Sequence, residues 1–94
     1  MAKSIISDEE CCYMCGSFRW IECHHIFGGA YRNKSERYGL KVNLCHYCHN
    51  EPPNGVHHNR ENRLALQKRA QLIAMEYYGW TVEDFINLFG RNYL

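Results

Sequence analysis

Residues 40–49 read Leu-Lys-Val-Asn-Leu-Cys-His-Tyr-Cys-His and carry the clearest structural signals of the chain. Residues 40–44 alternate apolar and polar side chains, which is the pattern of a short strand. The strand runs directly into Cys45-x-x-Cys48, where two intervening residues let a tight turn aim both sulfur atoms at one ion. The stretch therefore predicts a strand that ends in a metal-binding knuckle.

A matching knuckle, Cys12-x-x-Cys15 followed by Gly16, lies upstream. Two such knuckles complete a tetrahedral four-thiolate zinc site, which stabilises a fold and leaves no position open for catalysis. Cys11 could replace Cys12 as a ligand, and disulfides or an iron–sulfur centre are the alternatives to zinc. Cys23 is left over, and we expect it to be a small buried apolar side chain.

Length and composition predict one small domain spanning residues 1–94. The chain has 94 residues, 46% of them hydrophobic, with 6 Cys and 6 His. A core of this size needs an additional staple, which a zinc ion would supply. No apolar run is long enough to span a bilayer, and the first residues lack the apolar core of a signal peptide. We therefore expect a cytoplasmic protein with no membrane association, in which metal binding is favoured over disulfides.

The remaining elements divide the domain into a Cys/His-rich half, residues 11–58, and a helical scaffold, residues 59–94. Residues 18–26 are rich in aromatic and β-branched side chains and predict a strand, whereas residues 30–39 are expected to form a loop. Asn59 as N-cap and Gly79 as stop predict a helix over residues 60–78. Thr81 and Asp84 resemble a capping box for a last helix that ends at Gly90. The stripes expected to face the core are Leu66, Ala70, Ile73 and Tyr77 in the long helix and Val82, Phe85, Ile86 and Phe89 in the last one.

The histidines predict a second metal site. His24 and His25 are adjacent in the first predicted strand, so they point to opposite faces and have different roles. One could hold a metal while the other faces a substrate. His24, His49 and one of His57 or His58 would form a three-ligand site with open positions, as catalytic metals require.

Charge is unevenly distributed, although the net charge is only +1. Between residues 19 and 69 there are nine basic and four acidic residues. A basic middle of this kind is typical of a nucleic-acid footprint, with an ordinary solvated face as the equal alternative.

The order His24-His25-Ile26, Leu44-Cys45-x-x-Cys48-His49 and a further His resembles the HNH (His-Asn-His, ββα-metal) endonucleases. Zinc-bearing members of that family frame the motif with two Cys-x-x-Cys knuckles, as here. The whole chain is also similar to small HNH-type proteins of bacteriophages and prophages. The resemblance implies an α+β fold: a small ββα-metal core with a four-cysteine structural zinc site, joined here to the two C-terminal helices.

The resemblance also implies roles. His24, His49 and His57 (or His58) would bind a catalytic divalent metal such as Mg²⁺, Mn²⁺, Ni²⁺ or Zn²⁺, and His25 would be the general base. Asn43, or Asn33, would orient His25. DNA is the implied partner, and the chain could work as a homodimer or beside a phage DNA-processing partner. The candidates for phosphate contacts are Arg32, Lys34, Arg37 and Arg63.

Two features depart from the family pattern. The third ligand usually follows the second by four residues on one helix, but here Pro52 and Pro53 interrupt the helix and His57 lies eight positions after His49. Asn43 also lies nearer the knuckle than the family pattern places its Asn. The main alternative function is a non-catalytic zinc module that binds nucleic acid or protein, and a redox role for the cysteine pairs is a third.

Overall fold

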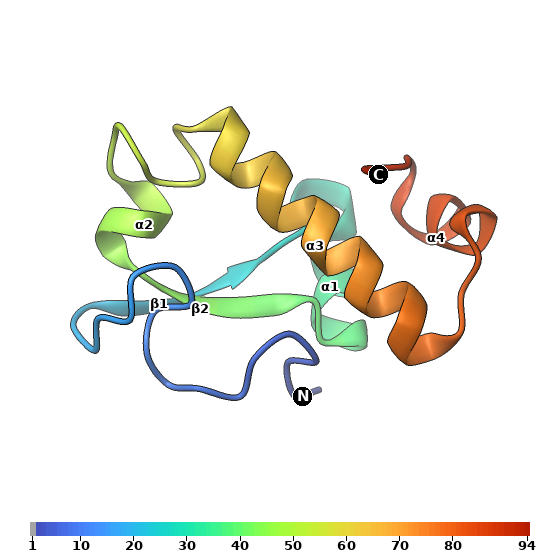
Figure 1. Cartoon of the computed structure of the whole chain (residues 1–94), viewed down its shortest axis with the longest axis horizontal. Helices are drawn as coiled ribbons and strands as arrows, with labels where there is room; N and C mark the ends of the chain where they lie inside the picture. Colours follow the sequence, from blue (N-terminus) through green and yellow to red (C-terminus); the bar gives the residue numbers. More distant parts are fainter. Residues whose placement is uncertain (1) are drawn as a thin grey trace.

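The computed structural model describes residues 2–94, in which a two-stranded hairpin is followed directly by a helix (Figure 1). The strands pair antiparallel, and α2 begins at the residue after β2 ends. The expected α+β fold with a ββα unit and two C-terminal helices is therefore confirmed. The elements are β1 (Ile21–His25), the 3₁₀ turn η1 (Gly29–Tyr31), α1 (Arg32–Tyr38), β2 (Lys41–Cys45), α2 (His46–Asn50), α3 (Arg60–Tyr78) and α4 (Val82–Phe89).

The strand register separates the two adjacent histidines. His24 pairs with Val42 and His25 with Lys41. Because side chains alternate along a strand, His24 shares a face with Glu22, Val42 and Leu44, and His25 lies on the other face. His24, Val42 and Leu44 are buried, so the His24 face is the one that joins the core.

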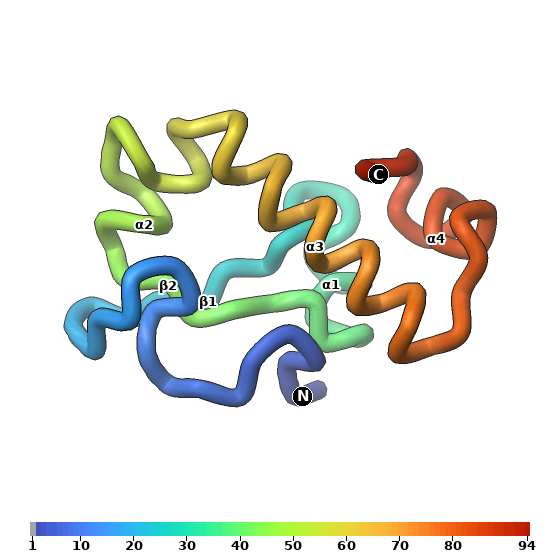
Figure 2. Tube along the Cα trace, viewed as in Figure 1, coloured from blue at the N-terminus to red at the C-terminus, as the bar shows by residue number. Residues whose placement is uncertain are grey.

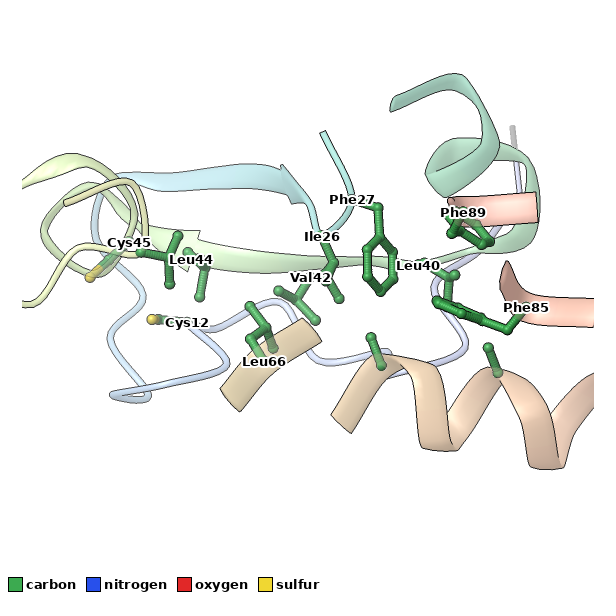
Figure 3. Packing of buried hydrophobic residues seen from close by; sticks show 13 residues of the cluster. Cys12, Ile26, Phe27, Leu40, Val42, Leu44, Cys45, Leu66, Phe85 and Phe89 are labelled. Atoms are coloured by element: carbon green, nitrogen blue, oxygen red, sulfur yellow. The ribbon is translucent and has the colours of Figure 1, made fainter. Parts of the chain in front are cut away.

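The core runs along the hairpin and differs in chemistry at its two ends (Figure 3). Cys12 and Cys45 lie at one end, and Phe27, Phe85 and Phe89 lie at the other. The Phe27 ring is 5.4 Å from that of Phe85 and 4.9 Å from that of Phe89, between centroids. The aromatic cluster therefore fastens α4 at the end away from the cysteines.

The helical half follows its predicted capping signals. The Asn59 side chain accepts a hydrogen bond from the Asn62 amide, and Gly79 ends α3 in a left-handed conformation. Thr81 and Asp84 form the predicted capping box of α4. The predicted core stripes are only partly correct, because Tyr77 is 66% exposed and Ile86 is also exposed. The buried face of α3 is rotated towards Gln71 and Ala74.

The expectation of a loop over residues 30–39 is wrong, since α1 occupies most of it. The helix has no apolar stripe, but buried Ser35 fixes it to the segment after β1. Ser35 Oγ donates to the Phe27 carbonyl at 2.7 Å and accepts from the Phe27 amide at 3.1 Å. The connection between β1 and β2 is therefore held by a tertiary contact that no local sequence pattern predicts.

The segment between α2 and α3 folds back beside α2 (Figure 2). The Val56 amide donates to the Cys48 carbonyl at 2.8 Å, and the His57 amide donates to the His49 carbonyl at 3.2 Å. Pro52 and Pro53 end the helix, yet the chain returns to it within a few residues. His57 therefore lies against His49 without sharing its helix.

Over residues 2–94, none of the helices combines the length and the apolar character needed to cross a membrane.

Candidate metal centres

Four cysteines, two from each knuckle, converge on one point. The sulfur atoms of Cys12, Cys15, Cys45 and Cys48 all lie within 4.8 Å of one another. Cys15 Sγ and Cys45 Sγ are 3.6 Å apart, much farther than a disulfide bond, and all six cysteines are free. The arrangement suits a tetrahedral Zn²⁺ site with every position filled by protein.

The first knuckle is shaped by a tight turn and docked on β2. The Gly16 amide donates to the Cys12 carbonyl at 2.9 Å, and Gly16 has a φ of +79°, which a side chain would make strained. The Tyr13 amide donates to the Asn43 carbonyl at 2.8 Å. This backbone contact holds the first knuckle beside the strand that ends in the second.

The four thiols shift one another's pKa values, and a bound cation would favour their thiolate forms. Burial raises the pKa of Cys48 strongly, and hydrogen bonding with Cys45, Cys15 and Cys12 raises it further. Burial also disfavours the Cys12 thiolate, but backbone amides outweigh that effect and lower its pKa to about 7. Four thiolates cannot lie this close together without positive charge between them, and a divalent metal would supply it.

The two remaining cysteines lie outside this cluster. Cys11 Sγ donates to Glu9 Oε2 at 3.2 Å, so Cys12 and not Cys11 joins the four-sulfur group. Cys23 is exposed, and the expectation that it is buried is wrong. It lies on the face of the hairpin that α3 leaves uncovered.

Three histidines form a second convergent group. His24, His49 and His57 each offer a ring nitrogen within 4.8 Å of the others. The Nε2 atoms of His49 and His57 are 3.0 Å apart. His24 Nε2 is buried and has no hydrogen-bond partner within residues 2–94. A buried imidazole nitrogen without a partner, on a ring grouped with two other imidazoles, fits a metal ligand.

The third position in this group is taken by His57. His58 lies outside the group and is exposed. Three ligands leave coordination positions open, in contrast to the closed cysteine site. His57 is also exposed, so these positions have access to solvent.

A carboxylate behind His49 sets its orientation. Glu22 Oε1 lies 2.7 Å from His49 Nδ1, and the side-chain amide of Asn50 donates to the same oxygen at 3.0 Å. Hydrogen bonds from His49 and then His46 lower the pKa of Glu22, so the carboxylate is ionised. With Nδ1 donating to Glu22, the lone pair of His49 is on Nε2, the atom that faces His57.

The surroundings of His24 and His57 favour the neutral form of both rings. Burial lowers the pKa of His24 to about 3, and the neighbouring histidines add to the effect. Burial, with charge repulsion from His49 and Arg63, also lowers the pKa of His57. Neutral imidazoles at pH 7 are the form that binds metals.

His25 lies across the strand from this group and has its own partners. Its Nε2 is 3.0 Å from Glu36 Oε1, and Lys41 Nζ is 2.6 Å from Glu36 Oε2. The hydrogen bond from Lys41, followed by that from His25, lowers the pKa of Glu36 to about 2. The His25 side chain is 11% exposed.

Asn43 lies on the same face of the hairpin as His25, but its side chain bonds to Glu9 and not to His25. Its side-chain amide donates to the Glu9 carbonyl at 3.1 Å, and its strand partner is Cys23. The group that contacts the His25 ring is Glu36. The orienting role of Asn43 therefore stays a prediction without a contact to support it.

The side chains of the predicted phosphate-binding residues differ in whether they already have partners within the protein. Lys34 Nζ donates to the Leu88 carbonyl at 2.9 Å, and Arg63 Nη1 donates to the Val56 carbonyl at 3.1 Å. Arg37 lies over the Tyr38 ring, 5.6 Å from its centroid, and Arg32 is exposed. Arg63 is thus held at the carbonyl of the residue before His57. The Lys34 side chain instead joins α1 to α4.

Glu22 and Glu36 are not among the residues predicted from the sequence. Glu22 precedes His24 by two positions in a strand, so period-two alternation places both on one face. This alternation is sufficient to place Glu22 beside His24 from the sequence alone. Glu36 lies in the unpredicted helix α1, and its contact with His25 depends on that helix.

Comparison with protein-family models, curated proteins and solved structures finds no match for this chain.

Proposed function

We propose that this chain is a metal-dependent endonuclease of the HNH type, which hydrolyses phosphodiester bonds in DNA. The observation that carries the proposal is the convergence of His24, His49 and His57 beside a separate, closed cysteine site. A protein that used metal only for stability would not need a second site with open positions. The motif order and the ββα arrangement support the same reading.

The ligands are preorganised for one divalent metal. Glu22 holds the His49 ring, and the backbone bond from His57 to His49 holds the third ligand beside it. A divalent ion bound there would neutralise charge on the scissile phosphate and on the leaving oxygen. The three neutral imidazoles leave the full charge of the ion available to the substrate.

His25 would accept the proton of the attacking water. When Nε2–H donates to Glu36, the lone pair of the ring is on Nδ1, which is the atom that can act as base. Because His24 and His25 lie on opposite faces of β1, the phosphate would approach the free edge of this strand. Arg63, fixed beside His57, supports binding of a neighbouring phosphate.

The second candidate is a non-catalytic metal-binding module that interacts with nucleic acid. It is favoured by the low exposure of the His25 side chain and by its hydrogen bond with Glu36. In that case His25 would serve only to tie α1 to the hairpin. The two candidates share both metal sites and differ in whether water is activated.

A supercoiled-plasmid nicking assay with Mg²⁺, Mn²⁺ or Ni²⁺ tests the proposal. The wild-type chain should nick plasmid only with added metal, and His25→Ala should lower the rate by at least 100-fold while keeping the fold. His58→Ala is the matched control, because His58 is exposed and outside the metal group. Metal binding without nicking under any of these conditions would support the second candidate.

A further inference from the structure

An exposed aromatic patch lies beside the second knuckle and is not used by either metal site. It consists of Trp20, the residue before β1, and Tyr47, in α2. Their side chains are 69% and 62% exposed. Together with Ser17 and Arg19 they line an open hollow of about 440 Å³. Large aromatic side chains are seldom left in solvent side by side unless they contact a partner.

The patch is held rigidly. The His46 amide donates to the Trp20 carbonyl at 2.9 Å, which ties Trp20 to the second knuckle. The Cys12 amide donates to the Ser17 carbonyl at 2.8 Å, and the Arg19 amide donates to Ser17 Oγ at 3.1 Å. These bonds fix residues 17–20 between the two knuckles, so the aromatic rings are presented by a rigid support.

Trp20 has an unfavourable backbone conformation for its residue type. Its φ is +52°, and it is the single non-glycine residue with positive φ among residues 2–94. A bulky side chain is rarely found there, and such strain tends to persist where a side chain is needed for function. A glycine would satisfy this backbone better, so the indole is present for a reason other than the turn.

The geometry of the rings leaves their faces available. The Trp20 and Tyr47 rings are 6.1 Å apart between centroids and inclined at 51°, so they do not stack on each other. Arg19 lines the same hollow and forms no ion pair within the described residues. Open aromatic faces with an unpaired guanidinium match the two parts of a nucleotide, a flat base and a phosphate.

The patch is also connected to the histidine site. His46 Nδ1 is 3.1 Å from Glu22 Oε2, and the other oxygen of Glu22 bonds to the metal-ligand candidate His49. The Trp20 ring lies 5.7 Å from the His46 ring, between centroids. A strand of nucleic acid on the patch would therefore lie close to the histidine site.

We propose that Trp20 and Tyr47 stack on unpaired nucleobases while Arg19 contacts the adjoining phosphate. The occupant is single-stranded nucleic acid, or a locally unpaired stretch of duplex, because bases within a duplex do not expose their faces. This inference rests on the proposed function and names the form of its substrate. The inference predicts that unpaired strands are selected by stacking on the patch. Hydrogen bonds to the edges of the bases are not needed for this selection.

Tryptophan fluorescence of the full zinc-loaded chain tests the proposal. The chain has two Trp, so Trp80→Phe leaves Trp20 as the only indole reporter. Without added catalytic metal, a twelve-nucleotide thymidine oligomer should quench Trp20, and an abasic oligomer of equal length should quench it little. Trp20→Gly should weaken binding by about tenfold, measured by anisotropy of labelled oligomer, while the melting temperature stays the same or rises.

Tyr77→Ala is the matched control, since Tyr77 is an exposed tyrosine on α3 away from the knuckles. Equal quenching by the abasic oligomer, or equal affinity of the wild type and Trp20→Gly, would overturn the stacking proposal. A fluorescence change that depends on protein concentration alone would also overturn it, by assigning the patch to self-association. Base-dependent quenching without cleavage by any metal would support the stacking proposal and overturn the proposed nuclease activity. Cleavage that is unaffected by Trp20→Gly would support the nuclease activity and overturn the stacking proposal.

Discussion

Glu22 Oε1 lies 2.7 Å from His49 Nδ1, and this contact determines which nitrogen of His49 faces the other two histidines. The carboxylate accepts a hydrogen bond from Nδ1–H, so the Nε2 lone pair is directed at His57 Nε2, 3.0 Å away. The same carboxylate accepts from Asn50 and contacts His46. Glu22 therefore ties β1 to three side chains of α2, one of which is the metal-ligand candidate His49.

Replacing Glu22 should weaken metal binding at the histidine site. In Glu22→Gln the acceptor loses its charge and the His49 ring is less firmly held, so we expect roughly 10- to 100-fold lower affinity for Ni²⁺ or Co²⁺. Isothermal titration with the cysteine site already filled by zinc measures the change. Glu51→Gln is the control, because Glu51 contacts His46 and not His49. An unchanged affinity in Glu22→Gln would show that the His49 ring is held by other contacts.

Gly55 should be required for the position of the third ligand, His57, because a side chain at residue 55 would clash with the backbone. A Cβ at Gly55 would lie 2.6 Å from the Glu51 carbonyl oxygen and 2.7 Å from the Glu51 amide nitrogen. Because backbone atoms cannot give way cheaply, Gly55→Ala should move the turn that returns His57 to His49. We expect a loss of about 1–3 kcal/mol in stability and weaker metal binding at the histidine site.

The control for Gly55→Ala is Asn54→Ala in the same turn. Asn54 contributes its backbone carbonyl to Asn62, and this bond survives the substitution. Urea unfolding and metal titration should therefore leave Asn54→Ala close to wild type. Equal metal affinity in Gly55→Ala and the wild type would mean that the turn adapts without moving His57.

Local signals in the sequence account for much of this fold. The two knuckles, the helix caps at Asn59 and Thr81 and the alternation in residues 40–44 are all short-range patterns, and each corresponds to a feature of the structure. The opposite orientation of His24 and His25 also follows from strand geometry alone. These features depend on neighbours within a few positions, where sequence patterns are most informative.

The features that were not predicted depend on contacts between distant residues. Helix α1 is fixed by Ser35 against Phe27, and its sequence has no apolar face of its own. Gln71 is buried in place of a predicted apolar residue because its side chain bonds to Asn92 and to the Tyr93 amide. The choice between His57 and His58 likewise depends on a returning turn, which spacing does not specify.

The cysteine site should be required for the fold. Cys48→Ser removes one of four thiolates from a closed site, and a small core has little stability to spare, so we expect loss of zinc and unfolding at 25 °C. Zinc content and far-ultraviolet circular dichroism measure both effects. Cys23→Ser should retain one zinc and the native spectrum, since Cys23 is exposed and outside the cluster. A folded, zinc-free Cys48→Ser chain would show that the hydrophobic core suffices.

Acid should destabilise the chain through His24 when the histidine site holds no metal. The folded state keeps the pKa of His24 at about 3, against an ordinary value of 6.5. Below pH 6.5 the unfolded chain binds a proton that the folded chain does not, so stability is complete above pH 6.5 and falls as the pH drops towards 3. The contribution of His24 approaches about 1.4 kcal/mol per pH unit in that window.

Urea unfolding at pH 7.5, 6.5 and 5.5, with zinc saturating the cysteine site, measures this dependence. In His24→Leu the titrating group is absent, so stability should fall less steeply between pH 6.5 and 5.5 than in the wild type. Protons taken up by the cysteines affect both proteins alike and cancel in the comparison. His58→Gln should keep the steeper wild-type slope. Parallel slopes for the wild type and His24→Leu would mean that His24 is not held neutral by burial, which removes one support for its role as a metal ligand.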